Sequence, residues 1–215
     1  MSLPVIVIGA GGHAAVVADA FMACGVEIVG FTDSDPRRNG GSHLGLPVLG
    51  SDESVLSGYK QDRIMLANGI GGIASAEIRR SVQTTLQQAG WRFATVQHPS
   101  AIVSSRAQIG PGVQLLAGSI VQVGASIGEG SIVNTGAIVE HDCEIGSFVH
   151  AAPRAPLCGD VKVGSGSHVG AGSVVRQGLR LGPCTVVGAG AVVVKDFEGH
   201  GVLIGNPARR AEPAA

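Results

Sequence analysis

Aliphatic residues recur at every sixth position from Val103 to Val193. An amphipathic helix repeats about every 3.6 residues and a strand every two, so a period of six indicates a repeat architecture. It predicts a triangular coil of short strands in which each unit of six residues forms one side and its turn, with the aliphatic side chain pointing inward. The sixteen positions are Val103, Ile109, Leu115, Val121, Ile127, Val133, Val139, Ile145, Ala151, Leu157, Val163, Val169, Val175, Leu181, Val187 and Val193.

Glycines and small residues follow the same period. Glycine is frequent three residues after the aliphatic position, where a turn needs positive φ or a close backbone approach. Small residues fill most positions four after it, as a cramped corner requires, and five other glycines recur every eighteen residues. The turn glycines are Gly112, Gly118, Gly124, Gly130, Gly136, Gly166, Gly172, Gly178 and Gly190, and the other five are Gly110, Gly128, Gly146, Gly164 and Gly182.

The residues before the repeat alternate between strand and helix patterns. An apolar run at 4–9 is typical of a buried parallel strand, and a helical pattern follows it. We expect further strands at 27–32, 63–66 and 92–96, a polar loop after Asp33, and a helix at 74–89. The fold class predicted is an α/β Rossmann-like half domain over 1–97, joined near Pro99 to an all-β parallel β-helix with a C-terminal cap over 98–215.

The first turn of the α/β region is rich in glycine. Backbone N–H groups in such a loop, together with a helix N-terminus, bind phosphate, and a carboxylate after the second strand can bind a ribose hydroxyl or a base edge. The unit of strand, glycine-rich turn, helix and second strand occurs only once in this sequence. A dinucleotide site needs two such halves, so a nucleotide-diphosphate sugar is favoured over NAD. The nucleotide-sugar residues predicted are Gly9, Gly11, Gly12, His13 and Asp33.

Composition narrows the classes of partner. The formal net charge of −1 gives no basic field for nucleic acid or a membrane surface. The four cysteines form no paired motif and no charged-then-apolar leader opens the chain, so we expect reduced thiols in a cytoplasmic protein. No apolar stretch reaches the length of a membrane span.

The repeat, the glycine loop, the length and the N-T-x-x-x-x-E-H run at 134–141 resemble the sugar-nucleotide N-acetyltransferases of bacterial glycan pathways, a group that includes the bacillosamine and perosamine acetyltransferases and the sialic acid O-acetyltransferase. The resemblance implies a left-handed β-helix, a homotrimer, acetyl-CoA as cosubstrate and no metal. It also implies a GDP-linked 4-amino-4,6-dideoxy sugar, perosamine, as acceptor, and a role in O-antigen biosynthesis.

The same resemblance implies roles for four residues near the middle of the repeat. His141 would act as general base with Asp142 ordering it, the Gly159 N–H would bind the oxyanion, and His150 would approach the acetyl carbonyl. The chemistry agrees, because an imidazole with a pKa near 6.5 can take a proton from an attacking amine at neutral pH. The alternative is that His141 and Asp142 are two surface residues at a polar corner.

The end of the chain resembles the closing G-x-P-A-[KR] signature of hexapeptide acetyltransferases, where a loop packs around the adenine end of coenzyme A. The residues concerned are Gly205, Asn206, Pro207, Ala208 and Arg209. Arg210 either joins them or caps the last coil. Cys143 is expected to pack a corner, Arg154 either meets phosphate or faces solvent, and the proline-containing stretch at 151–156 is expected to reshape its coil.

Other functions stay open on sequence alone. His141, His150 and His168 are similar to the three-histidine zinc site of hexapeptide-repeat carbonic anhydrases, although the front domain has no use in such an enzyme. A UDP-linked amino sugar, O-acetylation of sialic acid and a non-enzymatic scaffold are further alternatives. The sequence does not decide between GDP and UDP, nor does it identify the sugar, the amino position or the size of the acyl group.

Overall fold

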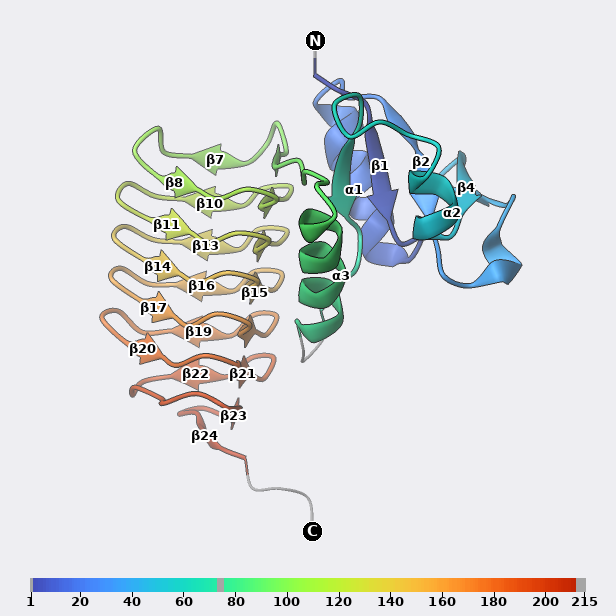
Figure 1. The fold of residues 1–215 in the computed structure, drawn as a ribbon. Coiled ribbons are helices and arrows are strands. Elements are labelled where there is room, and N and C mark those ends of the chain that lie inside the picture. Colours follow the sequence, from blue (N-terminus) through green and yellow to red (C-terminus); the bar gives the residue numbers. More distant parts are fainter. Residues whose placement is uncertain (1, 73–75, 212–215) are drawn as a thin grey trace.

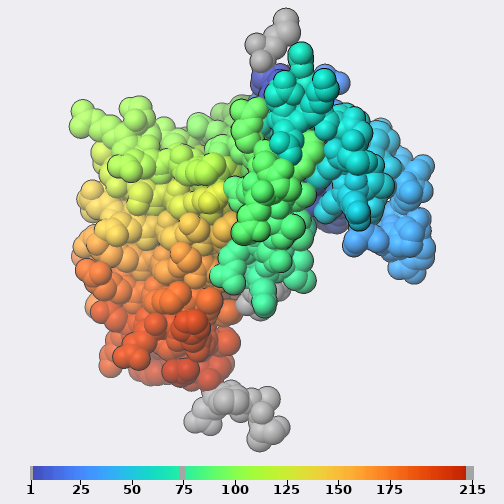
Figure 2. All heavy atoms as spheres, viewed as in Figure 1, coloured from blue at the N-terminus to red at the C-terminus, as the bar shows by residue number. Residues whose placement is uncertain are grey.

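The computed structural model describes residues 2–72 and 76–211. An α/β unit at the N-terminus lies beside a stack of short strands that runs to the C-terminus (Figure 1). Figure 2 shows the segment that carries α3 (Glu77–Gln88), in green, packed against the side of this stack. None of the helices in the described ranges is long and apolar enough to cross a membrane.

The N-terminal unit contains a five-stranded sheet in the order β3-β4-β2-β1-β5. All its pairs are parallel except the β3–β4 hairpin. Helix α1 follows the first strand, as the glycine-rich turn predicts. The strands are β1 (Val5–Ile8), β2 (Ile28–Thr32), β3 (Ser42–His43), β4 (Leu46–Gly50) and β5 (Met65–Asn68), and the helices are α1 (Gly12–Ala23), the 3-10 helix η1 (Pro36–Arg38), α2 (Asp52–Leu56) and α3.

The predicted order of elements is found in this unit, with two differences. The segment expected to be a polar loop contains β4 and α2, because Val48, Val55 and Leu56 are buried against the sheet although polar and glycine residues surround them. In the strand expected at 92–96, Phe93 makes an isolated bridge to β5, and Val96 begins a separate short strand, β6 (Val96–Gln97). Helix α3 begins at Glu77, and the first two residues of the helix predicted at 74–89 lie outside the described residues.

The second unit is a parallel β-helix with three faces. We call them the apolar face, the charged face and the histidine face. The apolar face holds β7 (Ile102–Val103), β10 (Ile120–Val121), β13 (Ile138–Val139), β16 (Pro156–Leu157), β19 (Val174–Val175) and β22 (Val192–Val193). The charged face holds β8 (Gln108–Ile109), β11 (Ser126–Ile127), β14 (Glu144–Ile145), β17 (Lys162–Val163) and β20 (Arg180–Leu181). The histidine face holds β6 (Val96–Gln97), β9 (Gln114–Leu115), β12 (Ile132–Val133), β15 (His150–Ala151), β18 (His168–Val169), β21 (Thr185–Val187), β23 (Gly201–Ile204) and β24 (Arg209–Arg210).

The inward positions predicted from the six-residue period form the core. Those from Leu115 to Val193 are all buried, whereas Val103 and Ile109 are half-buried at the first coil. The nine turn glycines all have φ between +64° and +75°. The same turn position carries a side chain in five other turns, at Asp142, Phe148, Arg154, Asp160 and Cys184, each with φ between +53° and +60°.

The two units share a buried interface on the histidine face. Leu116 and Ile132 of the β-helix join the core cluster that contains Ala14 and Val17 of α1. Arg79 of α3 is 2% exposed, and its guanidinium donates to the carbonyl oxygens of Gly130 (3.1 Å), Asn68 (2.8 Å) and Ile70 (2.8 Å). Burial lowers the pKa of Arg79 to about 9. The α/β unit is therefore held against the middle coils of the β-helix.

Candidate active site

His141 and Asp142 lie in the turn between β13 and β14, at the corner between the apolar and charged faces. Successive side chains on a strand point to opposite sides, but Asp142 has φ +60°, which turns its carboxylate towards the preceding residue. Aspartate tolerates this left-handed conformation better than most residues. The His141 Nδ1–H donates to Asp142 Oδ2 at 2.9 Å, so the shorter aspartate still contacts the ring directly.

The acidic surroundings favour the protonated imidazole. The pKa of His141 is raised above its usual value, mainly by the hydrogen bond to Asp142, with partial desolvation opposing it and the charges of Asp142, Glu140 and Asp160 adding to it. The side chain is 58% exposed. Because Nδ1 is occupied, Nε2 is the atom that can exchange a proton with a ligand.

Gly159 lies one coil further along the same corner. A Cβ on Gly159 would lie 2.5 Å from both Cε1 and Nε2 of His141, so the imidazole needs a glycine there. The Gly159 N–H donates to no group in the described chain. His141, Gly159, Asp160, Gln177 and Gly178 line a hollow of about 270 Å³. Gln177 was not predicted from the sequence, although its position eighteen residues after Gly159 places it in the next coil of the same corner.

His13 and His150 form a second group, on the histidine face. His150 Nδ1–H donates to Gly72 O (2.9 Å), and its Nε2 accepts from Asn134 Nδ2 (3.0 Å), which defines its neutral tautomer. His13 Nε2–H donates to Gln114 Oε1 (2.9 Å), and the His13 and His150 rings lie 6.4 Å apart. Burial is the main reason that the pKa of each of these two histidines is lowered to about 4.

His168 lies next to His150, as their spacing of one coil predicts, and the two rings meet edge to face with centroids 4.9 Å apart. His141 lies at a different corner of the triangle. Among residues 2–72 and 76–211, no group of three or more His, Cys, Asp or Glu side chains is placed to hold a metal ion. The zinc alternative therefore gains no support from the geometry of this chain.

The glycine loop is open at the start of α1. Gly9 has φ +89°, and a Cβ on Gly11 or Gly12 would meet nothing within 4 Å. Asp33 closes the other side of the loop, because its Oδ2 accepts from the Ala10 N–H (3.2 Å) and its Oδ1 from the Asp35 N–H (2.9 Å).

Two residues that the sequence did not single out lie at the same loop. Arg38 Nη1 donates to Ala10 O (2.5 Å) and lies 3.6 Å from Asp33 Oδ2, and His43 Nε2 donates to Gly11 O (3.1 Å). Arg38 ends η1 and His43 ends β3, two short elements after β2 whose sequence has no periodic pattern that marks individual side chains.

The C-terminal signature forms the turn between β23 and β24. Gly205 (φ +92°), Asn206, Pro207 and Arg209 are exposed, while the Ala208 N–H donates to Val192 O (2.7 Å). None of these residues lines the hollow of about 270 Å³ beside His141. The guanidinium of Arg210 lies over the Phe197 ring at 5.5 Å, which agrees with a capping contact.

The proline-containing stretch keeps the path of the β-helix. The Arg154 N–H donates to Thr135 O (3.0 Å) and Pro153 O accepts from the Gly172 N–H (2.9 Å). The change expected in this coil is limited to the ladder: Pro156 has no N–H to donate where the equivalent Ile138 N–H donates to Ala155 O, and only Leu157 of β16 pairs with β19. The Arg154 side chain is exposed.

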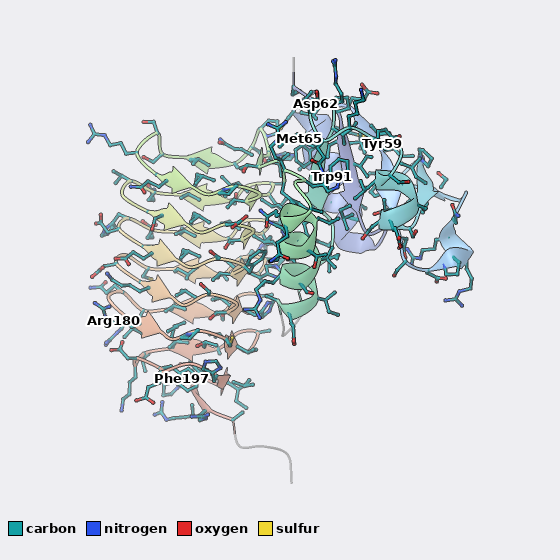
Figure 3. The ribbon with its side chains drawn as sticks, viewed as in Figure 1. Tyr59, Asp62, Met65, Trp91, Arg180 and Phe197 are labelled. Atoms are coloured by element: carbon teal, nitrogen blue, oxygen red, sulfur yellow. The ribbon has the colours of Figure 1, made fainter. Side chains whose placement is uncertain are left out.

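Another hollow, of about 810 Å³, lies away from both histidine groups, on the charged face. Arg180 and Phe197, labelled in Figure 3, line it together with the ion pair of Glu144 and Lys162. Neither His141 nor any residue of the glycine loop contributes to it. We assign no part of the reaction to this hollow.

Residues 4–86 match the family model of the PglD N-terminal domain. No curated protein matches the chain. Among solved structures, the acetyltransferase domain of PglB from Neisseria gonorrhoeae, also solved with acetyl coenzyme A, is 34% identical over 98% of this chain and 100% of that one, with a TM-score of 0.89. PerB from Caulobacter crescentus, in complex with CoA and GDP-perosamine, is 35% identical over 99% and 100%, with a TM-score of 0.88.

The H141A mutant of GDP-perosamine N-acetyltransferase from Caulobacter crescentus, in complex with the same two ligands, is equally similar, at 35% identity over 99% of this chain and 100% of that one and a TM-score of 0.89. The identity and coverage extend over the α/β unit, the β-helix and the C-terminal turn. The chain belongs to the family of acetyl-CoA-dependent sugar N-acetyltransferases.

Proposed function

We propose that this protein transfers the acetyl group of acetyl-CoA to the 4-amino group of GDP-perosamine, with His141 as general base. The observation that carries the proposal is the hollow in which His141, ordered by Asp142, lies against Gly159, whose N–H donates to no group in the described chain. The choice of sugar is supported by the similarity to the enzyme solved with CoA and GDP-perosamine. A UDP-linked amino sugar is the alternative, since Asp33 suits either nucleotide.

The reaction is a direct attack of the amine on the thioester. The amine nitrogen bonds to the carbonyl carbon as His141 Nε2 takes its proton, and the Gly159 N–H donates to the oxygen that becomes negative. The tetrahedral intermediate then collapses to the amide, and the leaving thiolate of coenzyme A takes the proton from His141. Asp142 stabilises the imidazolium between the two transfers.

An acyl-enzyme on Cys143 has no support. The side chain is completely buried, and its pKa is raised to about 11, mainly by burial. A thiol with that pKa is almost entirely protonated at neutral pH and is a poor nucleophile. The acetyl group therefore goes to the sugar in one displacement.

The two histidine groups would meet across a subunit boundary. The apolar face carries an outward ladder of aliphatic residues and proline that belongs to none of the core clusters of the described residues, and Ile102 is 66% exposed. The corner that holds His141 borders one edge of this face, and the corner that holds Asn134 borders the other. The outward residues are Ile102, Ile120, Ile138, Pro156, Val174 and Val192.

A homotrimer with the apolar faces around its axis brings these two corners together at each boundary. One subunit supplies His141, Asp142 and Gly159, and the next supplies His150 and, from its 1–97 domain, His13. The nucleotide lies on Gly9, Gly11, Gly12 and Asp33, and coenzyme A follows the His141 corner towards the turn at 205–209. The 98–215 domain thus carries both the catalytic groups and the trimer contacts.

The test is release of coenzyme A thiol from acetyl-CoA by the purified protein with a panel of acceptors, with and without chelator. The panel contains GDP- and UDP-linked 4-amino sugars, free amino sugars and sialic acid. We expect rapid release with GDP-perosamine, unaffected by chelator, and loss of most turnover in His141→Asn with both ligands still bound. Release with sialic acid alone, activity only with added zinc, or normal turnover by His141→Asn would contradict the proposal.

A further inference from the structure

The thiol of Cys143 bridges a turn of the neighbouring coil. Its Sγ–H donates to Cys158 O at 3.2 Å, and the Val161 N–H faces the sulfur from the other end of the same turn. In the described chain the direct hydrogen bond from Val161 N–H to Cys158 O, which closes a turn of this kind, is not formed. The corresponding direct bond is present elsewhere, for example from the Ala125 N–H to Gln122 O.

Two serines make the same bridge elsewhere in the β-helix. Ser131 Oγ donates to Gly146 O (2.9 Å) and accepts from the Val149 N–H (3.0 Å). Ser167 Oγ likewise accepts from the Thr185 N–H (3.0 Å) and contacts Gly182 O (3.3 Å), although its hydroxyl group lies nearer to Gly164 O (2.7 Å). In all three cases the carbonyl lies fifteen residues and the N–H eighteen residues after the bridging side chain. The bridge is thus a recurring device of this β-helix, and a thiol serves at one site where hydroxyls serve at two.

The bridged turn at Cys143 contains the proposed oxyanion donor. The carbonyl of Cys158 and the N–H of Gly159 belong to one planar peptide group and point in opposite directions. A donor on the carbonyl therefore fixes the direction of the N–H and, because hydrogen bonds in a chain polarise one another, strengthens it as a donor. His141 lies against the other side of the same glycine, so the peptide is held from both sides.

We propose that Cys143 is a positioning residue for catalysis, whose thiol orients and polarises the Cys158–Gly159 peptide so that the Gly159 N–H is aimed at the thioester oxygen. This inference rests on the function proposed above. The equivalent sites in the coils on either side hold Ala125 and Val161, which have no side-chain donor. Of these three side chains, only that of Cys143 can make the bridge, and it contacts the peptide group that contains the Gly159 N–H.

The burial of Cys143 suits this role. No part of the side chain is exposed, and its pKa of about 11 keeps the donor proton on sulfur throughout the neutral range. Packing alone would be served equally by alanine or valine, which occupy the same position in the adjacent coils. The hydrogen bond from the Cys143 thiol to Cys158 O is therefore a feature that packing alone does not require.

The test compares Cys143→Ala, Cys143→Ser and Ser131→Ala by kcat, KM for each substrate and thermal midpoint. Cys143→Ala should lose about threefold to tenfold in kcat with both KM values little changed, as removal of one hydrogen bond from a polarising chain implies. Cys143→Ser should recover most of that loss, because the hydroxyl group of Ser131 already makes this bridge. Ser131→Ala removes a bridge remote from Gly159, so its thermal midpoint should fall while kcat stays at the wild-type value.

A second readout does not depend on turnover. In protein labelled with 15N-glycine, Cys143→Ala should shift the Gly159 amide resonance, whereas Ser131→Ala should leave it in place. An unmoved Gly159 resonance, an unchanged kcat in Cys143→Ala or an equal kcat loss in Ser131→Ala would overturn the inference. Absence of acetyl transfer by the wild type, with the Gly159 shift present, would instead contradict the proposed function and leave the peptide contact standing.

Discussion

Gly124 lies one coil before Asp142, and a Cβ on Gly124 would overlap the Oδ1 atom of the Asp142 carboxylate. Both residues occupy the left-handed position of their turns, with φ +75° and +60°. The glycine thus leaves room for the carboxylate to turn towards His141. The orientation of His141, the proposed base, therefore depends on Asp142 and also on glycine at position 124 in the preceding coil.

Gly124→Ala should therefore impair catalysis more than stability. The added methyl group pushes the Asp142 carboxylate away from His141, and we expect kcat to fall roughly tenfold, the equivalent of a lost charge-assisted hydrogen bond. Gly172→Ala is the matched control, because Gly172 has a similar φ of +64° but a Cβ there would meet nothing within 4 Å. Both variants should lose about 1 kcal/mol of stability through the positive φ. An equal kcat in the two variants would contradict the argument.

A second prediction concerns the dependence of kcat/KM on pH. In the proposed mechanism the neutral form of His141 is the active base, so the rate should rise with pH through a pKa that the Asp142 contact raises above the usual histidine value. Asp142→Asn removes the carboxylate charge that stabilises the imidazolium, so the acidic limb should move to lower pH while the plateau rate falls. Steady-state rates between about pH 5 and 9 measure both effects.

Asp160→Asn supplies the comparison for this pH profile. Asp160 lines the same hollow and raises the pKa of His141 by charge alone, as the smallest of the causes. The acidic limb of the pH profile of Asp160→Asn should also move to lower pH, but by less than that of Asp142→Asn. A limb that stays in place in Asp142→Asn would mean that the titrating group is not His141.

Much of the β-helix was predictable because its rule is local. A period of six and a glycine at the left-handed position define the coil, and the nine turn glycines all have the predicted positive φ. The direct contact between His141 and Asp142 was harder to predict, since it depends on the backbone conformation of one aspartate. A signal was nevertheless present: the turn glycine is replaced in four successive turns, at Asp142, Phe148, Arg154 and Asp160.

Contacts between distant segments could not be predicted in this way. The hydrogen bond from His13 to Gln114 joins residues 101 positions apart, and the three carbonyls around Arg79 come from both domains. The element β4 was missed because Pro47 and Gly50 are typical of loops, although the strand pairs with β2 at the side of the sheet. Such features follow from tertiary packing, which has no period along the chain.

Arg79 supports a prediction about stability. Arg79→Ala leaves the carbonyls of Gly130, Asn68 and Ile70 without their donor and opens space between the domains, so the free energy of unfolding should fall by roughly 2 to 4 kcal/mol. Arg80→Ala removes the neighbouring exposed arginine on the same helix and should change it by less than about 0.5 kcal/mol. Denaturant titration of both variants measures the difference, and equal losses would show that the buried guanidinium is not what holds the interface.

The last prediction separates assembly from chemistry. Ile120→Glu places a charge in the middle of the outward ladder of the apolar face, and in a trimer that charge would be buried without a partner. We expect light scattering to show a monomer, and acetyl transfer to fall at least about a hundredfold, because His141 then lacks the neighbour's His13 and His150. Gln108→Glu introduces the same charge at an exposed position of the charged face, and it should leave both mass and activity unchanged. A monomeric Ile120→Glu protein with full activity would show that one chain contains the whole site, and the division of the reaction between subunits would have to be abandoned.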